Sequence, residues 1–188
     1  GQAPERLIDS YHVERKHAAL ENIKNSARSA DFLTPRSPAH ALFRDAVLDL
    51  AETHAFARPM VNSGRLSTPA VYHGSPLNGL DEMAGAALGQ PGSPCPDAPV
   101  ADGYLLDHLA GDFVVLGVGF DVPERLDAQG VAVRGLTVAP TAMLRDRLVG
   151  GAECGVLLVR PDQHIAARWR KLDLAAIRAA VDGALAKD

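Results

Sequence analysis

The chain has 188 residues, of which 47% are hydrophobic, and a formal net charge of −4. This hydrophobic content is enough for a packed core and excludes global disorder. Because no block of basic residues occurs and the longest apolar runs are far shorter than the ~20 residues of a membrane helix, the sequence excludes a nucleic-acid surface and a membrane span.

Two helices are predicted in the first third of the chain. Pro4 fits the first turn of a helix, and residues 5–28 contain neither proline nor glycine and carry a rough apolar stripe. A second helix is predicted to begin with Ser37 as N-cap and Pro38 as its first residue, and to end near residue 55. The short break between the two helices suggests that they form an antiparallel pair.

The middle of the chain is predicted to be extended and irregular. Residues 58–76 and 78–99 are rich in proline, glycine and small residues and have few periodic apolar positions. We place the junction between two units here, so that residues 1–86 form a helical segment with an extended loop and residues 87–188 form a compact domain.

The second half of the chain alternates predicted strands and helices. Strands are predicted at residues 113–118 and 131–138, with a short helix between them at residues 122–129. A helix that is capped by Thr141 and stopped by Gly150-Gly151 follows the second strand.

A hairpin and a helix are predicted to close the chain. Residues 156–159 form an unbroken apolar run, residues 160–163 (RPDQ) form a turn, and residues 165–169 alternate with one face toward a core. His164 is expected on the opposite face, exposed to solvent or at an interface. The last helix is capped by Asp173.

This order of elements predicts an α/β fold in which helices cover both faces of a mixed sheet, as in thioredoxin-like domains, preceded by a helical segment. A thioredoxin-like redox site needs a reactive thiol after the first core strand, but residues 119–124 contain no cysteine. Two cysteines, Cys95 and Cys154, are also too few for a disulfide scaffold. Redox catalysis is therefore disfavoured. A free-standing thioredoxin- or peroxiredoxin-like protein that uses Cys95 or Cys154 remains the alternative.

No other motif for catalysis or binding is complete. Gly117-Val118-Gly119 begins a nucleotide-binding fingerprint, but its third glycine would fall at Val122, so a crowded strand end is the better interpretation. The seven histidines lack zinc-site spacing, and no serine lies in a nucleophile elbow. We therefore predict no catalytic, cofactor-binding or metal-binding residue in this chain.

Two segments resemble one enzyme family. Residues 3–15 (APERLIDSYHVER) resemble the LLDSY..ER helix of the FAD-dependent aromatic hydroxylases typified by para-hydroxybenzoate hydroxylase. Residues 156–169, which include Val159-Arg160-Pro161-Asp162, resemble the LVRPDG..AWR hairpin of longer members such as phenol hydroxylase and hydroxyphenylpropionate hydroxylase. Arg58-Pro59 and residues 64–67 resemble the segment that leads into the C-terminal domain of those members.

The resemblance implies that the chain is the C-terminal portion of such a flavoprotein, with a thioredoxin-like domain that lacks redox cysteines. The family holds FAD through glycine- and aspartate-containing motifs, and this sequence begins after all of them. FAD and NAD(P)H are therefore expected to bind the intact parent rather than this chain. Tyr11, Glu14 and Arg15 would pack the long helix against the missing FAD domain.

The sequence leaves three hypotheses. In the first, the chain is a non-catalytic structural or dimerisation module of a cytoplasmic monooxygenase, an oxidoreductase that hydroxylates a phenolic ring with FAD, NAD(P)H and O₂, and the chain alone is inactive. Its partners would be the missing N-terminal FAD domain and a second copy in a homodimer, with no nucleic acid and no membrane. The second hypothesis is the thiol-based alternative. The third is a binding module that recognises a partner through the helices at residues 5–55.

Overall fold

The computed structural model describes residues 4–83 and 88–187, and it divides the chain into two compact units. One unit combines residues 1–14 with residues 71–188, and the other consists of residues 15–70. The predicted boundary between residues 86 and 87 lies outside the described residues and stays a prediction. Within the described residues, no helix has the length and apolar character required to cross a membrane.

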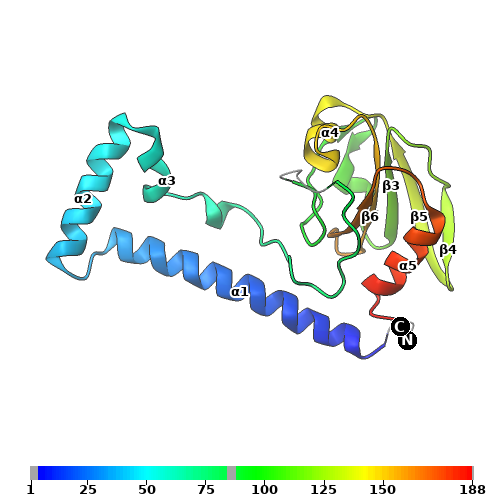
Figure 1. The fold of residues 1–188 in the computed structure, drawn as a ribbon, viewed down its shortest axis with the longest axis horizontal. Coiled ribbons are helices and arrows are strands. Elements are labelled where there is room, and N and C mark those ends of the chain that lie inside the picture. The colour runs from blue at the N-terminus through cyan, green and yellow to red at the C-terminus, as the bar shows by residue number, and fades with distance from the viewer. Residues whose placement is uncertain (1–3, 84–87, 188) are drawn as a thin grey trace. The chain divides into compact units, whose positions relative to one another are not determined.

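A five-stranded sheet forms the centre of the first unit (Figure 1). Its strands lie in the order β4 (Arg125–Ala128), β5 (Val131–Val138), β3 (Phe113–Val118), β6 (Gly155–Val159) and β7 (Ile165–Trp169). β3 and β5 are parallel and the other neighbours are antiparallel, so the sheet is mixed. A separate two-stranded ribbon consists of β1 (Pro99–Val100) and β2 (Gly103–Tyr104).

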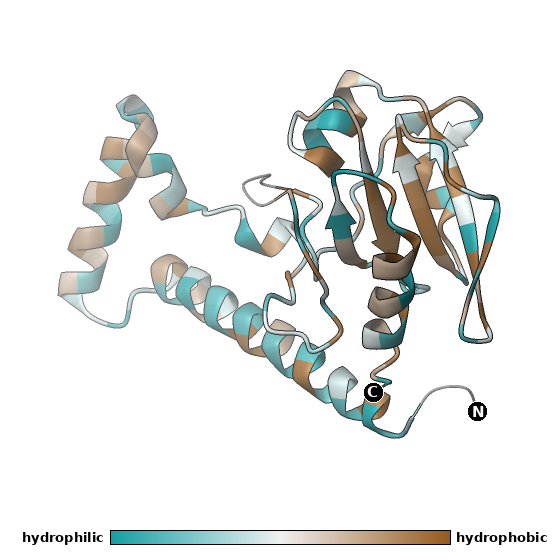
Figure 2. Ribbon diagram, turned by 45° about the vertical axis from the view of Figure 1, so that its right-hand side comes forward, coloured by the Kyte–Doolittle hydropathy of each residue, from teal (hydrophilic) through white to brown (hydrophobic). Residues whose placement is uncertain are grey.

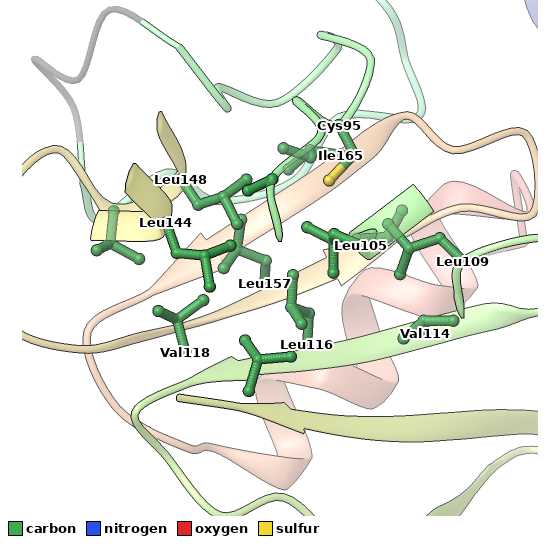
Figure 3. Packing of buried hydrophobic residues seen from close by; sticks show 14 of the residues in the cluster. Cys95, Leu105, Leu109, Val114, Leu116, Val118, Leu144, Leu148, Leu157 and Ile165 are labelled. Carbon is green, nitrogen blue, oxygen red and sulfur yellow. The ribbon is translucent and has the colours of Figure 1, made fainter. Parts of the chain in front are cut away.

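Two helices cover the opposite faces of this sheet. Successive side chains of a strand point to opposite faces, and β3 is buried along its whole length, so it contributes to both cores. On one face, Val114, Leu116 and Val118 belong to the cluster with Leu144 and Leu148 of α4 (Ala142–Val149), as Figure 3 shows. On the other face, the cluster includes α5 (Leu174–Ala184). The predicted α/β fold, a mixed sheet flanked by helices, is confirmed.

Helix boundaries follow the capping signals of the sequence. The Thr141 hydroxyl accepts from the Leu144 amide at the start of α4, and Gly150 ends this helix in the left-handed conformation. The Asp173 carboxylate accepts from two amides at the start of α5. These contacts satisfy terminal amide groups that have no partner within the helix.

The predicted helix at residues 122–129 is wrong, because this segment contains strand β4. β4 pairs with β5 through a two-residue turn, Gln129-Gly130, in which both residues have positive φ (52° and 83°). Such a turn matches the twist of an antiparallel hairpin. The sheet contacts thus override the helical interpretation of the segment between β3 and β5.

A second correction concerns β7, where the sequence predicted that Ile165 shares a face with Ala167 and Trp169. In the pairing with β6, Leu158 opposes Ala167 but Val159 opposes Ile165, so β7 carries one extra residue, a β-bulge. The bulge places Ile165 in the α4 core and Trp169 in the α5 core. Every residue of β7 is buried, whereas only one face was expected to be buried.

The irregular segment before the domain covers the outer edge of β7. Gly79 donates to the Ala166 carbonyl at 2.8 Å, and Gly92 donates to the Ile165 carbonyl at 2.8 Å. In return, the amide of Arg168 donates to the Leu80 carbonyl at 2.8 Å. An open strand edge would expose unpaired backbone groups, so this segment completes the sheet without forming a regular strand.

The helical segment begins with a long helix, α1 (Arg6–Leu33), followed by α2 (Pro38–Thr53). α2 is capped by the Ser37 hydroxyl as predicted. Short helical turns follow at Ala55–Ala57, Arg58–Val61 (α3) and Arg65–Ser67, and another occurs at Leu105–His108. Figures 1 and 2 show α2 turning away from the end of α1, so the predicted antiparallel pair does not form. Figure 2 also shows apolar residues of α1 interspersed with hydrophilic ones, whereas the strands of the sheet are mainly hydrophobic.

Candidate functional site

The two segments that carry the family resemblance meet at a buried ion pair. Glu14, from the first segment, lies on α1, and Arg160, from the second, opens the turn between β6 and β7. The Arg160 guanidinium donates from Nη1 to Glu14 Oε1 at 2.6 Å and from Nη2 to Oε2 at 3.0 Å. The two side chains are 8% and 7% exposed. This two-pronged geometry is the strong form of an arginine–carboxylate contact.

The local sequence of the turn places Arg160 at this position. Gln163 donates its amide to the Arg160 carbonyl at 2.9 Å and has φ of 65°, while Pro161 occupies the second turn position. The Asp162 carboxylate accepts from Arg160 Nε at 3.1 Å and from Nη2 at 2.6 Å. Because Asp162 accepts from the edge of the guanidinium formed by Nε and Nη2, the edge formed by Nη1 and Nη2 faces Glu14.

A serine from the irregular segment completes the site. The Ser75 hydroxyl donates to Glu14 Oε1 at 2.6 Å and accepts from the Leu77 amide at 3.2 Å. We call these four residues, Glu14, Ser75, Arg160 and Asp162, the Glu14 cluster. All of them belong to the unit that contains the sheet.

The charges of the Glu14 cluster stabilise one another. Burial by itself raises the pKa of Glu14, but hydrogen bonds from Arg160 and Ser75 outweigh burial and leave the pKa below its usual value. Burial likewise opposes the shift at Asp162, and His164 and Arg160 lower its pKa well below the usual range. For Arg160, burial lowers the pKa, but the two carboxylates raise it above the usual value. The cluster therefore stays fully ionised at neutral pH.

An aromatic pair lies beside the cluster. The His164 ring stacks on Tyr72 with 5.0 Å between ring centroids and 17° between the ring planes, and its Nδ1 lies 3.4 Å from Asp162 Oδ2. Its side chain is 17% exposed. His164 was expected to face solvent or an interface, but most of its ring is covered within its own unit, where Tyr72 stacks on one face.

A second buried arginine, Arg168, joins three segments of the same unit. It is 0% exposed, and it donates from Nε and Nη2 to the Asp81 carboxylate at 3.0 and 2.7 Å. It also donates to the backbone carbonyls of Leu88 and Leu148, both at 3.1 Å. Since Leu148 belongs to α4, this guanidinium connects β7, α4 and the irregular segment.

The structure assigns different surroundings to the three residues that were expected to face an FAD domain. Tyr11 is 66% exposed and Arg15 is also exposed, so both side chains remain accessible. Glu14 instead turns inward to Arg160, and this corrects the expected role of Glu14. The acidic residue of the DSYxxER segment thus binds the thioredoxin-like domain itself.

The two cysteines are free, and Cys95 is unsuited to thiol chemistry. Cys95 is 4% exposed and lies in the α4-side core, as Figure 3 shows. Burial, and then the charge of Asp97, raise the pKa of the Cys95 thiol to about 12. The reactive thiolate is therefore scarce at neutral pH. Cys154 is half-buried in the connection between α4 and β6.

The glycines near the end of β3 lie at a crowded strand end, which is the interpretation that the sequence favoured over a phosphate-binding loop. A Cβ on Gly117 would overlap the backbone carbonyl of Phe120, and a Cβ on Gly135 in β5 would overlap that of Pro123. The close approach of the chain's own backbone therefore accounts for both glycines without a bound phosphate. Among residues 4–83 and 88–187, no group of three or more His, Cys, Asp or Glu side chains could hold a metal ion.

Sequence reasoning missed the contacts of Ser75, Tyr72 and the Arg168–Asp81 pair. Asp81 precedes Arg168 by 87 residues and lies in a segment without periodicity, so no spacing rule connects the two residues. Arg160 and Glu14 both lie within the resembling segments, but nothing in the sequence indicates that they bind each other.

No protein-family profile matches the chain. A curated relative, 4-methyl-5-nitrocatechol 5-monooxygenase from a Burkholderia species, is 28% identical over 197 residues. The alignment covers 93% of this chain and 34% of the relative. The chain therefore spans about a third of the length of the curated relative that it matches.

Solved structures match over nearly the whole chain. The rebeccamycin biosynthetic enzyme RebC with reduced flavin superimposes with a TM-score of 0.62 at 22% identity, covering 98% of this chain and 37% of RebC. The flavin-dependent monooxygenase PieE, in complex with FAD and substrate, gives 0.64 at 19% identity, covering 99% and 41%. Aklavinone-11 hydroxylase, with FAD and aklavinone, gives 0.60 at 20%, covering 100% and 36%. The chain has the fold of the C-terminal portion of FAD-dependent aromatic monooxygenases, as the sequence resemblance predicted.

Proposed function

We propose that this chain is the C-terminal, non-catalytic module of an FAD-dependent aromatic hydroxylase. The observation that carries the proposal is the alignment of 93% of the chain with only 34% of a nitrocatechol monooxygenase. The fold supports it, because 98–100% of the chain superimposes on 36–41% of three flavin enzymes. The parent would be an NAD(P)H- and O₂-dependent oxidoreductase of the cytoplasm that hydroxylates a phenolic ring.

Two observations support placing the flavin site outside this chain. A Cβ on Gly117 in β3 would overlap the Phe120 carbonyl, so the close approach of the chain's own backbone accounts for this glycine without a bound phosphate. Arg160 and Arg168, the buried cations that could bind a phosphate, are already paired with Glu14 and Asp81. In this proposal the FAD and NAD(P)H sites lie in an N-terminal domain of the parent, and this chain supplies no catalytic residue.

The role we propose is structural. The unit that contains the sheet buries an apolar cluster on each face of the sheet. By contrast, α1 and α2 expose large apolar side chains, including Ile8, Leu42 and Phe43. Apolar surface of this kind indicates a covering partner. We propose the FAD domain of the parent and a second copy of the chain as its partners.

The thiol-based alternative loses one of its two candidates, because Cys95 is buried and its thiol pKa is raised to about 12. A peroxide and disulfide reduction assay of the Cys154→Ser variant tests the remaining candidate. Complete loss of a measurable reductase activity in this variant would favour the alternative over a structural module.

Purification of the 188-residue chain tests the proposed function directly. We expect no stoichiometric flavin absorbance after incubation with FAD, and no consumption of NAD(P)H in the presence of a catechol or phenol. Reading the coding region upstream of Gly1 is the complementary test, and we expect a frame that encodes a glycine-rich dinucleotide fingerprint. Stoichiometric FAD on this chain alone would contradict the assignment of the flavin site to another domain.

A further inference from the structure

The Glu14 cluster lies where the chain leaves the sheet unit and where it returns. We call residues 1–14 and 71–188 the sheet unit and residues 15–70 the helical unit. Glu14 is the last residue of the sheet unit before the helical unit begins at Arg15. The chain re-enters the sheet unit at Val71, and Ser75 follows four residues later. We call residues 7–14 and 71–78, which lead out of the sheet unit and back into it, the crossing segments. They meet at the Glu14 carboxylate, since Ser75 donates to Glu14 at 2.6 Å.

Arg160 is the group that fixes this meeting point to the sheet. It belongs to the turn between β6 and β7, and it holds Glu14 through two hydrogen bonds of 2.6 and 3.0 Å. Asp162 in turn holds Arg160, so the guanidinium cannot rotate away from Glu14. On the returning segment, Tyr72 is tied by its amide to the Gly92 carbonyl at 2.9 Å and stacks on His164, which follows the same turn.

We propose that Arg160 is the anchor that holds both crossing segments on the sheet unit, so that residues 15–70 behave as an insertion with both ends fixed at one point. Segments whose two ends start close together can be inserted into a domain without disturbing its core. The inference depends on the contacts of the Glu14 cluster and does not require the proposed function.

Removal of Arg160 has a consequence that an ordinary surface ion pair lacks. In Arg160→Met, the buried Glu14 carboxylate loses its cation, and breaking a buried pair on one side is far more costly than losing an exposed pair. Both crossing segments should then loosen together. Ser75→Ala, by contrast, leaves the Arg160–Glu14 pair in place and removes two contacts of the returning segment, the link to Glu14 and the acceptor of the Leu77 amide.

Hydrogen–deuterium exchange of the 188-residue chain tests the anchor. In Arg160→Met we expect amide exchange in residues 7–14 and in residues 71–78 to rise together, by at least about tenfold, while β3 and α5 exchange as in the unaltered chain. In Ser75→Ala only residues 71–78 should respond. Arg170→Met is the matched control, because Arg170 is exposed and its hydrogen bonds to Glu82 lie outside the Glu14 cluster.

Two further variants keep the test decisive if Arg160→Met does not fold. Arg160→Lys retains the charge but not the two-pronged geometry, so we expect a partial, correlated rise in both segments. Glu14→Gln leaves Arg160 paired with Asp162 and should give a smaller rise in both. The proposal is overturned if exchange rises in one segment alone in the arginine and glutamate variants, or if none of these variants changes either segment.

Discussion

At the scale of single residues, two arginines hold most of the buried charge of the sheet unit. Arg160 and Arg168 are both buried, and each pairs with a carboxylate and makes further hydrogen bonds. Such pairs add little net stability compared with a well-packed apolar replacement, but loss of one partner leaves an uncompensated charge. The two sites therefore fix the arrangement of segments more than they add to the free energy of unfolding.

We predict that Arg168→Met lowers the free energy of unfolding by about 3 to 5 kcal/mol, the usual cost of breaking a buried pair. The variant leaves Asp81 without its cation and removes the donor to the Leu88 and Leu148 carbonyls. Urea denaturation of the variant and of the unaltered chain measures the difference. Arg170→Met, at an exposed position of the same region, should change stability by less than about 0.5 kcal/mol. Equal effects of the two substitutions would contradict the structural role of Arg168.

The Glu14 cluster predicts that stability falls in acid. The pKa values of Glu14 and Asp162 are lower in the folded chain than in the unfolded chain, so the unfolded chain binds more protons as the pH falls. Their contribution is fully present above the unfolded pKa values, about 4 for both carboxyl types, and is lost as the pH falls through the lower folded values. Urea denaturation between pH 7 and acid pH should show this decline.

Glu14→Gln provides the control for the acid effect. The amide cannot titrate, so the dependence of stability on pH should be flatter than in the unaltered chain. An unchanged acid slope in Glu14→Gln would show that other carboxyl groups cause the decline.

At the scale of elements, local capping chemistry predicted more than strand patterning did. Ser37, Thr141 and Asp173 cap helices as the sequence indicated, because a cap depends on residues within one turn. β4 was missed because the segment's short helical pattern hid a two-residue turn at Gln129-Gly130. The bulge in β7 was missed because alternation along one strand does not show how its neighbour is aligned.

The candidate site was predictable only in part for the same reason. Arg160 and Glu14 stood in recognisable segments, but they are 146 residues apart, and their contact depends on how α1 meets the sheet. Ser75 and Asp81 lie in a segment that has no periodic pattern. Its attachment to β7 uses backbone amide and carbonyl groups, which every residue type except proline provides in full, so the sequence does not encode it visibly.

A matched pair of glycine substitutions tests the close contact of β5 with the segment before β4. In Gly135→Ala, the new Cβ would overlap the Pro123 carbonyl, so the backbone must shift and stability should fall by about 1 to 3 kcal/mol or more. In Gly183→Ala, nothing lies within 4 Å of the new Cβ in α5. This substitution should raise stability by up to about 1 kcal/mol through helix propensity. Thermal unfolding of both variants gives the comparison. A neutral Gly135→Ala variant would show that this contact is not as tight as the structure indicates.

At the scale of the whole chain, the two units differ in how much apolar surface they bury. The sheet unit has a core on each face of its sheet. Among residues 15–70, all of which the structure describes, the buried apolar residues are Val47 and Ala57. In the same range, large exposed side chains include Leu33, Leu42, Phe43, Phe56, Met60 and Leu66. Helices gain most of their stability from packing an apolar face, and this unit has little to pack against within itself.

We therefore predict that residues 38–53 exchange amide hydrogens much faster than β3 and α5 in the dilute chain. The physical reason is that α2 buries one residue, Val47, whereas β3 is buried along its whole length. Hydrogen–deuterium exchange measured at several protein concentrations, together with light scattering, separates the two proposed covers. If a second copy covers these helices, protection and apparent mass should rise together with concentration. If the FAD domain of the parent covers them, protection should stay low at every concentration and appear only in the longer protein. Strong protection of α2 in a monomer would contradict both proposed partners, the second copy and the FAD domain, because it would show that the helical unit is stable by itself.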